Sequence, residues 1–146
     1  MVFYGDATGD LQELITRYDV GSMARHGGRL GQQDTYAAQK SADLLLFLEH
    51  ARPSVDGILT GKLFEYLYVD TPVLGVGITP ESAPGRMIVR AGAGHVVGTS
   101  VEAVQDTLMT HMEGRADVRR DREFISGFSR RGQVERLAAT MQGLRG

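Results

Sequence analysis

The sequence contains no cysteine. Disulfide bonds, thiolate catalysis and cysteine-ligated metals are therefore excluded in one step. The four histidines offer no substitute, because His26, His50, His95 and His111 are scattered without metal-site spacing and no H-E-x-x-H motif occurs. We accordingly expect no metal site.

Long apolar runs are also missing. The longest, Leu44 to Leu48, has the length of a strand, and nothing resembles a signal peptide or a membrane span. We therefore expect a soluble, cytoplasmic protein.

The charge balance argues against nucleic acid as a partner. The formal net charge is only −2. A local group of arginines near the C-terminus lacks the aromatic side chains on which bases stack. We interpret this group as a solvated helix face; it comprises Arg119, Arg120, Arg122, Arg130 and Arg131.

At 146 residues the chain has the length of one domain, and strand-like and helix-like segments alternate along it. Strands are expected at 1–4, 20–26, 42–48, 72–76 and 95–98, and helices within 6–20, 32–42, 62–69, 84–91, 101–112 and 117–144, the last broken near Gly127. This alternation predicts a parallel sheet with helices on both faces. The continuous apolar run at 42–48 is of the kind found in a strand buried on both faces. Ligands of such sheets bind at the carboxyl ends of the strands.

The segment 54–76 organises this prediction, because it contains a loop, a short helix and a buried strand. The Thr60 hydroxyl can cap the helix by accepting a hydrogen bond from an unpaired backbone N–H of the first turn. The residues expected to face inward are Leu63, Phe64 and Leu67.

The amino end of this helix is a candidate phosphate site. It follows a loop that contains Gly57 and Gly61, and the free N–H groups and the positive end of the helix dipole favour an anion there. Lys62 and Glu65 lie on another face, one turn apart. Glu65 is then placed to accept hydrogen bonds from sugar hydroxyls beyond the phosphate.

A plainer interpretation stays open, because loop, capped helix and strand occur in every α/β domain. The loop lacks the G-x-x-x-x-G-K-[ST] pattern, and Lys62 with Glu65 could form an ordinary surface ion pair. Glu49 and His50, just beyond a predicted strand, fit a solvated loop pair better than a catalytic one.

Other motifs give no function. The glycines at 92 and 94 follow a predicted helix and precede a strand, the reverse of a dinucleotide fingerprint. No G-x-S-x-G anchors a hydrolase triad.

The segment GKLFEYLYVDTPVLGVG resembles the donor-binding segment of retaining glycosyltransferases with two Rossmann domains (the GT-B type), and is most similar to group 1 bacterial enzymes. The flanking segments HGGRLGQQDTYAAQKSADLLLFL, GRMIVRAGAGHVVGTSVEAVQDTL and GFSRRGQVERLAATM resemble family segments in the same order. The resemblance therefore covers nearly all of the chain. Residues 1–146 are accordingly expected to form one nucleotide-sugar-binding domain.

The resemblance implies roles for individual residues. Glu65 matches the second glutamate of the family's E-x7-E motif, which binds the ribose of a nucleoside diphosphate sugar. Gly57 stands where the first glutamate would be, so no carboxylate contacts the donor sugar from that position.

The remaining donor-binding positions surround the diphosphate and the base. Lys62 would add positive charge near the diphosphate. The backbone N–H groups of the loop would come from Ile58, Leu59, Thr60 and Gly61, and the base would lie against Arg29 or Leu30.

The resemblance thus implies a Rossmann-like C-terminal half of a GT-B glycosyltransferase, without the N-terminal acceptor domain. The expected substrate is a nucleotide sugar such as a uridine diphosphate sugar, used without metal or cofactor in polysaccharide or glycoconjugate synthesis. The isolated chain would bind nucleotide weakly and transfer no sugar. Two alternatives remain: a non-catalytic binding or regulatory module, and a sugar-nucleotide epimerase of the same architecture.

Overall fold

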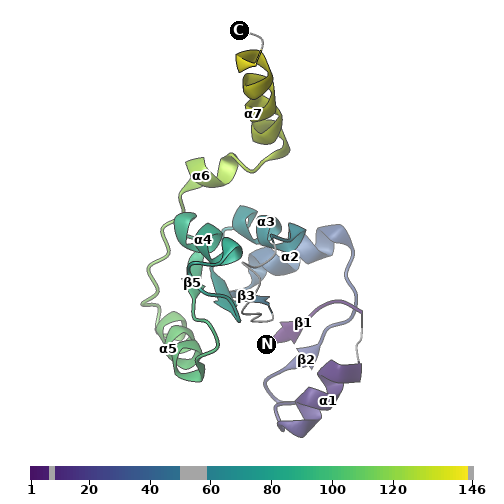
Figure 1. Cartoon of the computed structure of the whole chain (residues 1–146). Coiled ribbons are helices and arrows are strands. Elements are labelled where there is room, and N and C mark those ends of the chain that lie inside the picture. Colours follow the sequence, from purple (N-terminus) through teal and green to yellow (C-terminus); the bar gives the residue numbers. More distant parts are fainter. Residues whose placement is uncertain (7–8, 50–58, 145–146) are drawn as a thin grey trace. The chain divides into compact units, whose positions relative to one another are not determined.

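The structure is a computed structural model that describes residues 1–6, 9–49 and 59–144. It divides into two compact units, Met1–Ala38 and Gln39–Gly146, and each is described by itself. Helices and strands alternate in both, as Figure 1 shows.

The first unit contains β1 (Val2–Phe3), α1 (Gly9–Arg17) and β2 (Arg25–His26), and α2 (Gln32–Ser41) begins in it. β1 and β2 form a parallel pair. Ile15 on α1 is buried, but Leu14 and Tyr18, which share its apolar pattern, are exposed. Strands of two residues cover only a short stretch of helix, so the apolar face of α1 is only partly buried.

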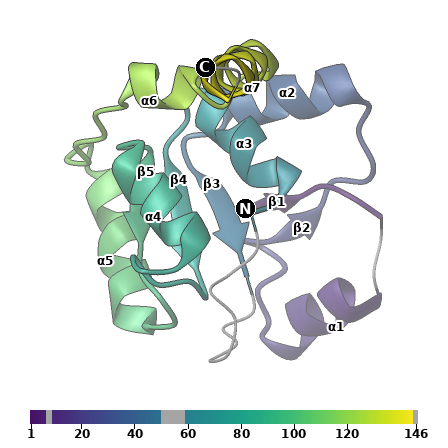
Figure 2. The ribbon, with the colours of Figure 1, turned by 45° about the horizontal axis from the view of Figure 1, so that its top comes forward.

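The second unit contains a three-stranded parallel sheet in the order β3-β4-β5 (Figure 2). Its strands are β3 (Leu45–Leu48), β4 (Val73–Val76) and β5 (Gly94–Val96), and its helices after α2 are α3 (Gly61–Tyr68), α4 (Ala83–Arg90), α5 (Val101–Met112), α6 (Arg122–Ser126) and α7 (Arg130–Gly143). Each predicted strand and helix has a counterpart, but β2 covers only the last two residues of the predicted strand 20–26, and the last predicted helix begins at Arg122 rather than at residue 117.

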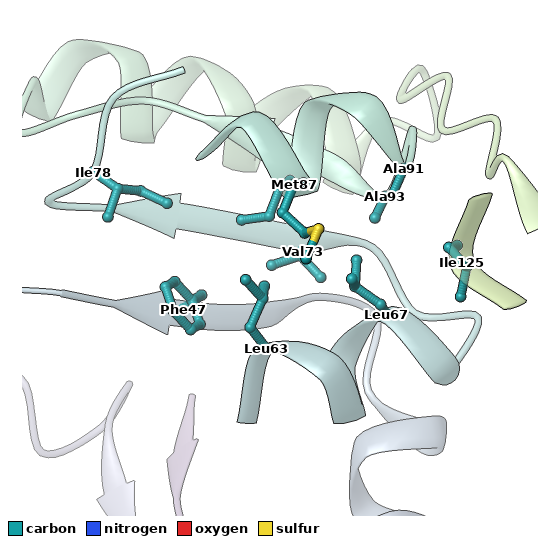
Figure 3. Packing of buried hydrophobic residues seen from close by; sticks show 10 residues of the cluster. Phe47, Leu63, Leu67, Val73, Ile78, Met87, Ala91, Ala93 and Ile125 are labelled. Carbon is teal, nitrogen blue, oxygen red and sulfur yellow. The ribbon is translucent and has the colours of Figure 1, made fainter. Parts of the chain in front are cut away.

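The helices α3 and α4 pack on one face of this sheet. Each connects two neighbouring parallel strands in the same direction, and right-handed crossovers then place both helices on the same side. Figure 3 shows their side chains meeting those of the strands. The buried cluster includes Phe47 and Val73 from the sheet, Leu63 and Leu67 from α3, and Met87 and Ile88 from α4.

The inward side of α3 agrees with the sequence prediction. Leu63 is fully buried, Leu67 is 2% exposed, and Phe64 is partly buried against the same cluster. Burial of two leucines contributes roughly 3–6 kcal/mol of hydrophobic stabilisation. This burial determines which side of α3 is left for solvent and ligands.

The opposite face of the sheet carries Leu74 and His95, which lie side by side on β4 and β5. The His95 ring contacts His111 of α5 edge to face, with ring centroids 5.6 Å apart. Helices therefore lie on both sides of this sheet, and the protein has an α/β fold with small parallel sheets.

One prediction about the sheet is wrong. The apolar run 42–48 was expected to be buried on both faces, yet Leu48 is 57% exposed. β3 lies at the edge of the three-stranded sheet, so the face of β3 that carries Leu48 has fewer neighbouring side chains to pack against.

The prediction of a solvated arginine face also fails at Arg120. Residues 117–121 are not helical, and the half-buried Arg120 guanidinium donates to the carbonyl oxygens of Leu67, at 2.8 Å, and Thr71. Burial lowers the pKa of Arg120. Sequence periodicity could not reveal this role, because the two carbonyls belong to a distant turn.

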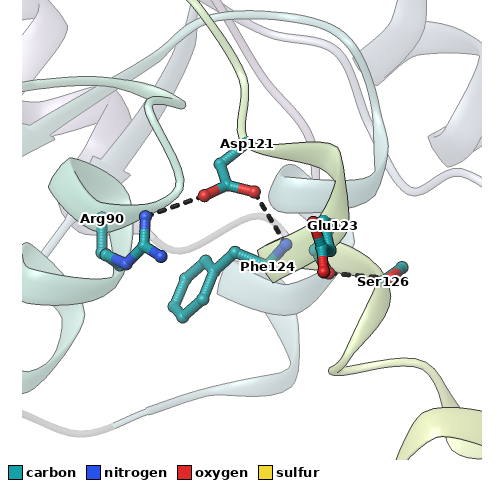
Figure 4. A network of polar contacts seen from close by, with 5 residues as sticks. All are labelled: Arg90, Asp121, Glu123, Phe124 and Ser126. Carbon is teal, nitrogen blue, oxygen red and sulfur yellow. Dashed lines mark hydrogen bonds and ion pairs between the residues drawn. The ribbon is translucent and has the colours of Figure 1, made fainter.

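The segment 117–121 is also hydrogen-bonded to the end of α4. The Asp121 amide donates to the Ala91 carbonyl at 2.9 Å, and the Asp121 carboxylate accepts from Arg90 at 2.7 Å and from the Phe124 amide at 2.8 Å (Figure 4). The hydrogen bond from Phe124, with help from Arg90, lowers the pKa of Asp121.

Gly92 allows the backbone at Arg119 to lie close to the end of α4. Its φ is +55°, and a Cβ there would overlap the Arg119 carbonyl oxygen. The glycine noted in the sequence therefore has a structural reason, close backbone contact at the end of α4.

Two helices, α5 and α7, have apolar side chains that are exposed to solvent. On α5, Val101, Leu108 and Met112 are exposed. On α7, the exposed residues are Val134, Leu137 and Met141. None of the described helices has the length and apolar character needed to cross a lipid bilayer.

Replacing Arg120 tests the role of its guanidinium. Arg120→Met should leave the Leu67 and Thr71 carbonyls without their donor and lower the free energy of unfolding by about 1–3 kcal/mol. Urea unfolding measures this. Arg119→Gln is the matched control, because the Arg119 side chain is 87% exposed and forms an ion pair with Asp117, which is exposed as well. A loss of more than about 0.5 kcal/mol there would contradict the assignment.

The His95–His111 contact predicts a pH dependence of stability. Burial, followed by the charge of His95, lowers the pKa of His111 below its usual 6.5 in the folded chain. The unfolded chain then binds more protons, so the free energy of unfolding should fall as the pH drops below about 6.5 and continue to fall to the lowered pKa.

Urea unfolding between pH 5 and 8 measures this slope. His111→Gln should flatten it, and His95→Gln should raise the NMR titration midpoint of His111. An unchanged midpoint in His95→Gln would show that His95 does not contribute.

Candidate functional site

The candidate site lies at the amino end of α3, which follows β3 in the chain. Leu59 and Thr60 lead into the helix, and both are exposed, as are Gly61 and Lys62 at its start. The first-turn N–H groups of a helix have no partner within the helix itself. Of these amides in α3, that of Leu63 donates to the Thr60 carbonyl at 3.1 Å, whereas those of Gly61 and Lys62 have no backbone acceptor in the described part of the chain.

Thr60 occupies the N-cap position as predicted, with extended backbone angles of φ −97° and ψ 157°. The predicted capping hydrogen bond is nevertheless wrong, because the Thr60 hydroxyl accepts none from the helix. An exposed hydroxyl loses little by facing solvent instead. Within residues 1–6, 9–49 and 59–144, no side chain accepts a hydrogen bond from the first-turn amides of α3.

The start of α3 differs in this respect from those of four later helices. The side chain at each of those N-caps accepts a hydrogen bond from a first-turn amide, at 2.8–3.2 Å. These N-cap residues are Ser82, Ser100, Asp121 and Ser129. Their helix starts already have an anionic or polar partner, whereas that of α3 has none from a side chain.

Glu65 and Lys62 lie on the exposed side of α3, as the helical period predicted. The Glu65 carboxylate accepts a hydrogen bond of 3.4 Å from the Gln39 side-chain amide. Among the described residues, no ion pair joins Lys62 to Glu65, so the alternative of an ordinary surface pair is not what the structure contains. Both charges remain available to a ligand.

The predicted site residues fall into three groups. Leu59, Thr60, Gly61, Lys62 and Glu65 lie together at the first turns of α3. Arg29 and Leu30 belong to the first unit, where Arg29 pairs with Asp6 at 3.4 Å between two exposed side chains. Ile58, together with Gly57 and His50, lies outside the described residues.

Sequence reasoning missed a second group of functional candidates, at the opposite end of α3. Asp70, His111, Arg120 and Arg122 line one cavity there. The arginines were visible in the sequence, but Asp70, the partner of Arg122, is about fifty residues away, so no local pattern joined them. In the ranges 1–6, 9–49 and 59–144, no three residues of the metal-binding types come together to hold an ion.

Comparisons with known proteins do not assign a family. No protein-family model matches the chain, and searches of curated proteins and of solved structures gave no significant match. The class that the structure defines is an α/β protein with small parallel sheets and helices on both sides.

Two cap substitutions test the description of the α3 start. Thr60→Ala should change the free energy of unfolding by no more than a few tenths of a kcal/mol, because no cap hydrogen bond is lost. Ser82→Ala, the matched control, removes a cap bond and should cost about 1 kcal/mol. Equal losses in urea unfolding would show that Thr60 caps α3 after all.

Proposed function

We propose that the chain is the donor-binding domain of a glycosyltransferase of the GT-B type, holding a nucleoside diphosphate sugar. The observation that carries this proposal is the amino end of α3, which is accessible, has no side-chain cap and is followed one turn later by the exposed Glu65. The group 1 resemblance, centred on the same helix, supports it.

The diphosphate would bind at the start of α3. The backbone N–H groups of Leu59, Thr60 and Gly61 and the positive end of the helix dipole favour an anion there. Ile58 would contribute in the same way, and Lys62 would add a positive charge. These groups would also stabilise the charge that develops on the diphosphate when the sugar is transferred, without the need for a metal.

The ribose would bind at Glu65. This residue lies four positions after Gly61, about 6 Å further along the helix axis. An ionised carboxylate accepts hydrogen bonds from both ribose hydroxyls, and such charge-assisted bonds are the stronger kind. The weak contact with Gln39, at 3.4 Å, would give way easily to the sugar.

In the GT-B family a second, acceptor-binding domain forms the other half of the cleft. The proposed activity is therefore transfer of a sugar in polysaccharide or glycoconjugate synthesis in the cytoplasm.

Titration with nucleotides tests the proposal. Uridine, guanosine and thymidine diphosphates are added separately and followed by calorimetry or by backbone amide NMR. At least one should bind and shift the amide signals at the start of α3. Glu65→Ala should weaken that binding by about 10- to 150-fold, because removal of one carboxylate partner costs about 1.5–3 kcal/mol.

Glu123→Gln is the matched control, because Glu123 is an exposed glutamate on α6. It should bind the same nucleotide as tightly as the wild type. Absence of binding for all three diphosphates, or equal affinities for the wild type and Glu65→Ala, would refute the proposal.

A further inference from the structure

A cavity of about 460 Å³ lies at the other end of α3, at the amino edge of the sheet. It is formed where the turn between α3 and β4 meets the end of α5 and the segment that leads to α6. Its lining consists of Asp70, Pro72, His111, Gly114, Ala116, Val118, Arg120 and Arg122. A cavity of this volume accommodates a small organic molecule.

The lining holds more positive than negative charge. Arg122 donates to Asp70 at 3.0 Å, and both side chains are largely exposed, so the Arg122 guanidinium keeps donors for a further partner. Among the described residues, no carboxylate forms an ion pair with Arg120, whose terminal nitrogens donate to backbone carbonyls. The lining thus contains one carboxylate and two guanidinium groups.

Two buried nitrogens of the lining residues have no hydrogen-bond partner within the described part of the chain. They are Nε of Arg120 and Nε2 of His111. A buried donor without an acceptor costs about 1–3 kcal/mol. Such groups are usually satisfied by a ligand, an ion or water.

The end of α5 does not oppose an anion strongly. Three carbonyl oxygens of its last turn, those of Met109, Thr110 and His111, accept hydrogen bonds from the amides of residues 113–115. These bonds reduce the partial negative charge that a helix end otherwise presents.

We propose that this cavity binds a small organic molecule that carries one phosphate or carboxylate group. The oxyanion pairs with Arg122 in place of Asp70 and lies within the field of Arg120. The apolar part of the molecule contacts the apolar wall, which consists of Pro72, Ala116 and Val118. Guanidinium groups suit both oxyanions, because their donors match two oxygens at once.

This site is separate from the proposed nucleotide site. α3 is eight residues long, so its two ends lie about 12 Å apart. The inference therefore does not depend on the proposed glycosyltransferase function.

Phenyl phosphate and benzoate are the probes, because each joins an oxyanion to an apolar ring. Each is titrated into the full chain and followed by NMR of the backbone and arginine side chains, with sodium chloride at matched ionic strength as the reference. At least one probe should bind and shift the signals of Arg122, and phenyl phosphate should bind more tightly than inorganic phosphate. Which probe binds identifies the oxyanion.

Two substitutions should change the affinity in opposite directions. Arg122→Gln should weaken binding about tenfold. Asp70→Asn should strengthen it, because the competing carboxylate is removed. Each disrupts an exposed ion pair worth about 0–1 kcal/mol, so the fold should persist, and circular dichroism checks this.

Arg131→Gln is the matched control, because Arg131 is an exposed arginine paired with Glu135 on α7. It should leave the affinity unchanged. The proposal is refuted if neither probe binds or if Asp70→Asn weakens binding. It is also refuted if Arg122→Gln binds a probe as tightly as the wild type, because the probe would then bind elsewhere, for example at the start of α3.

Discussion

Burial of Leu63 and Leu67 against the face of β3 and β4 is the constraint on which the rest of the second unit depends. Because these two leucines must leave water, α3 can present only its opposite side to solvent. That side carries Lys62 and Glu65. The parallel order of the strands sets the direction of α3, since a right-handed crossover leaves one strand and returns to the next on the same face.

The two ends of α3 differ in the hydrogen-bond partners of their terminal backbone groups. At the carboxyl end, the Arg120 guanidinium donates to the Leu67 carbonyl, and a cation there also interacts favourably with the helix dipole. At the amino end, no side chain in the described part of the chain accepts a hydrogen bond from the first-turn amides. One helix therefore has a structural partner at one end and leaves the other accessible, which is the property that the proposed nucleotide site requires.

Much of this arrangement could be predicted from sequence because it is local. Helical spacing identified Leu63, Phe64 and Leu67 as the inward side of α3, and short apolar runs identified the strands. The Thr60 cap was predicted at the correct residue but not with the correct bond, because a hydroxyl's choice between solvent and helix depends on its surroundings. Arg120 was misinterpreted because its partners are carbonyls of a distant turn.

The sequence alone determined the alternation of strands and helices and the side of each helix that is apolar, since both follow from periodicity along the chain. Only the tertiary structure decided which long-range groups meet: Asp70 with Arg122, His95 with His111, and residues 119–121 with the ends of α3 and α4. The physical reason is that these contacts join residues far apart in the chain, and their energies depend on burial and distance rather than on neighbouring residues.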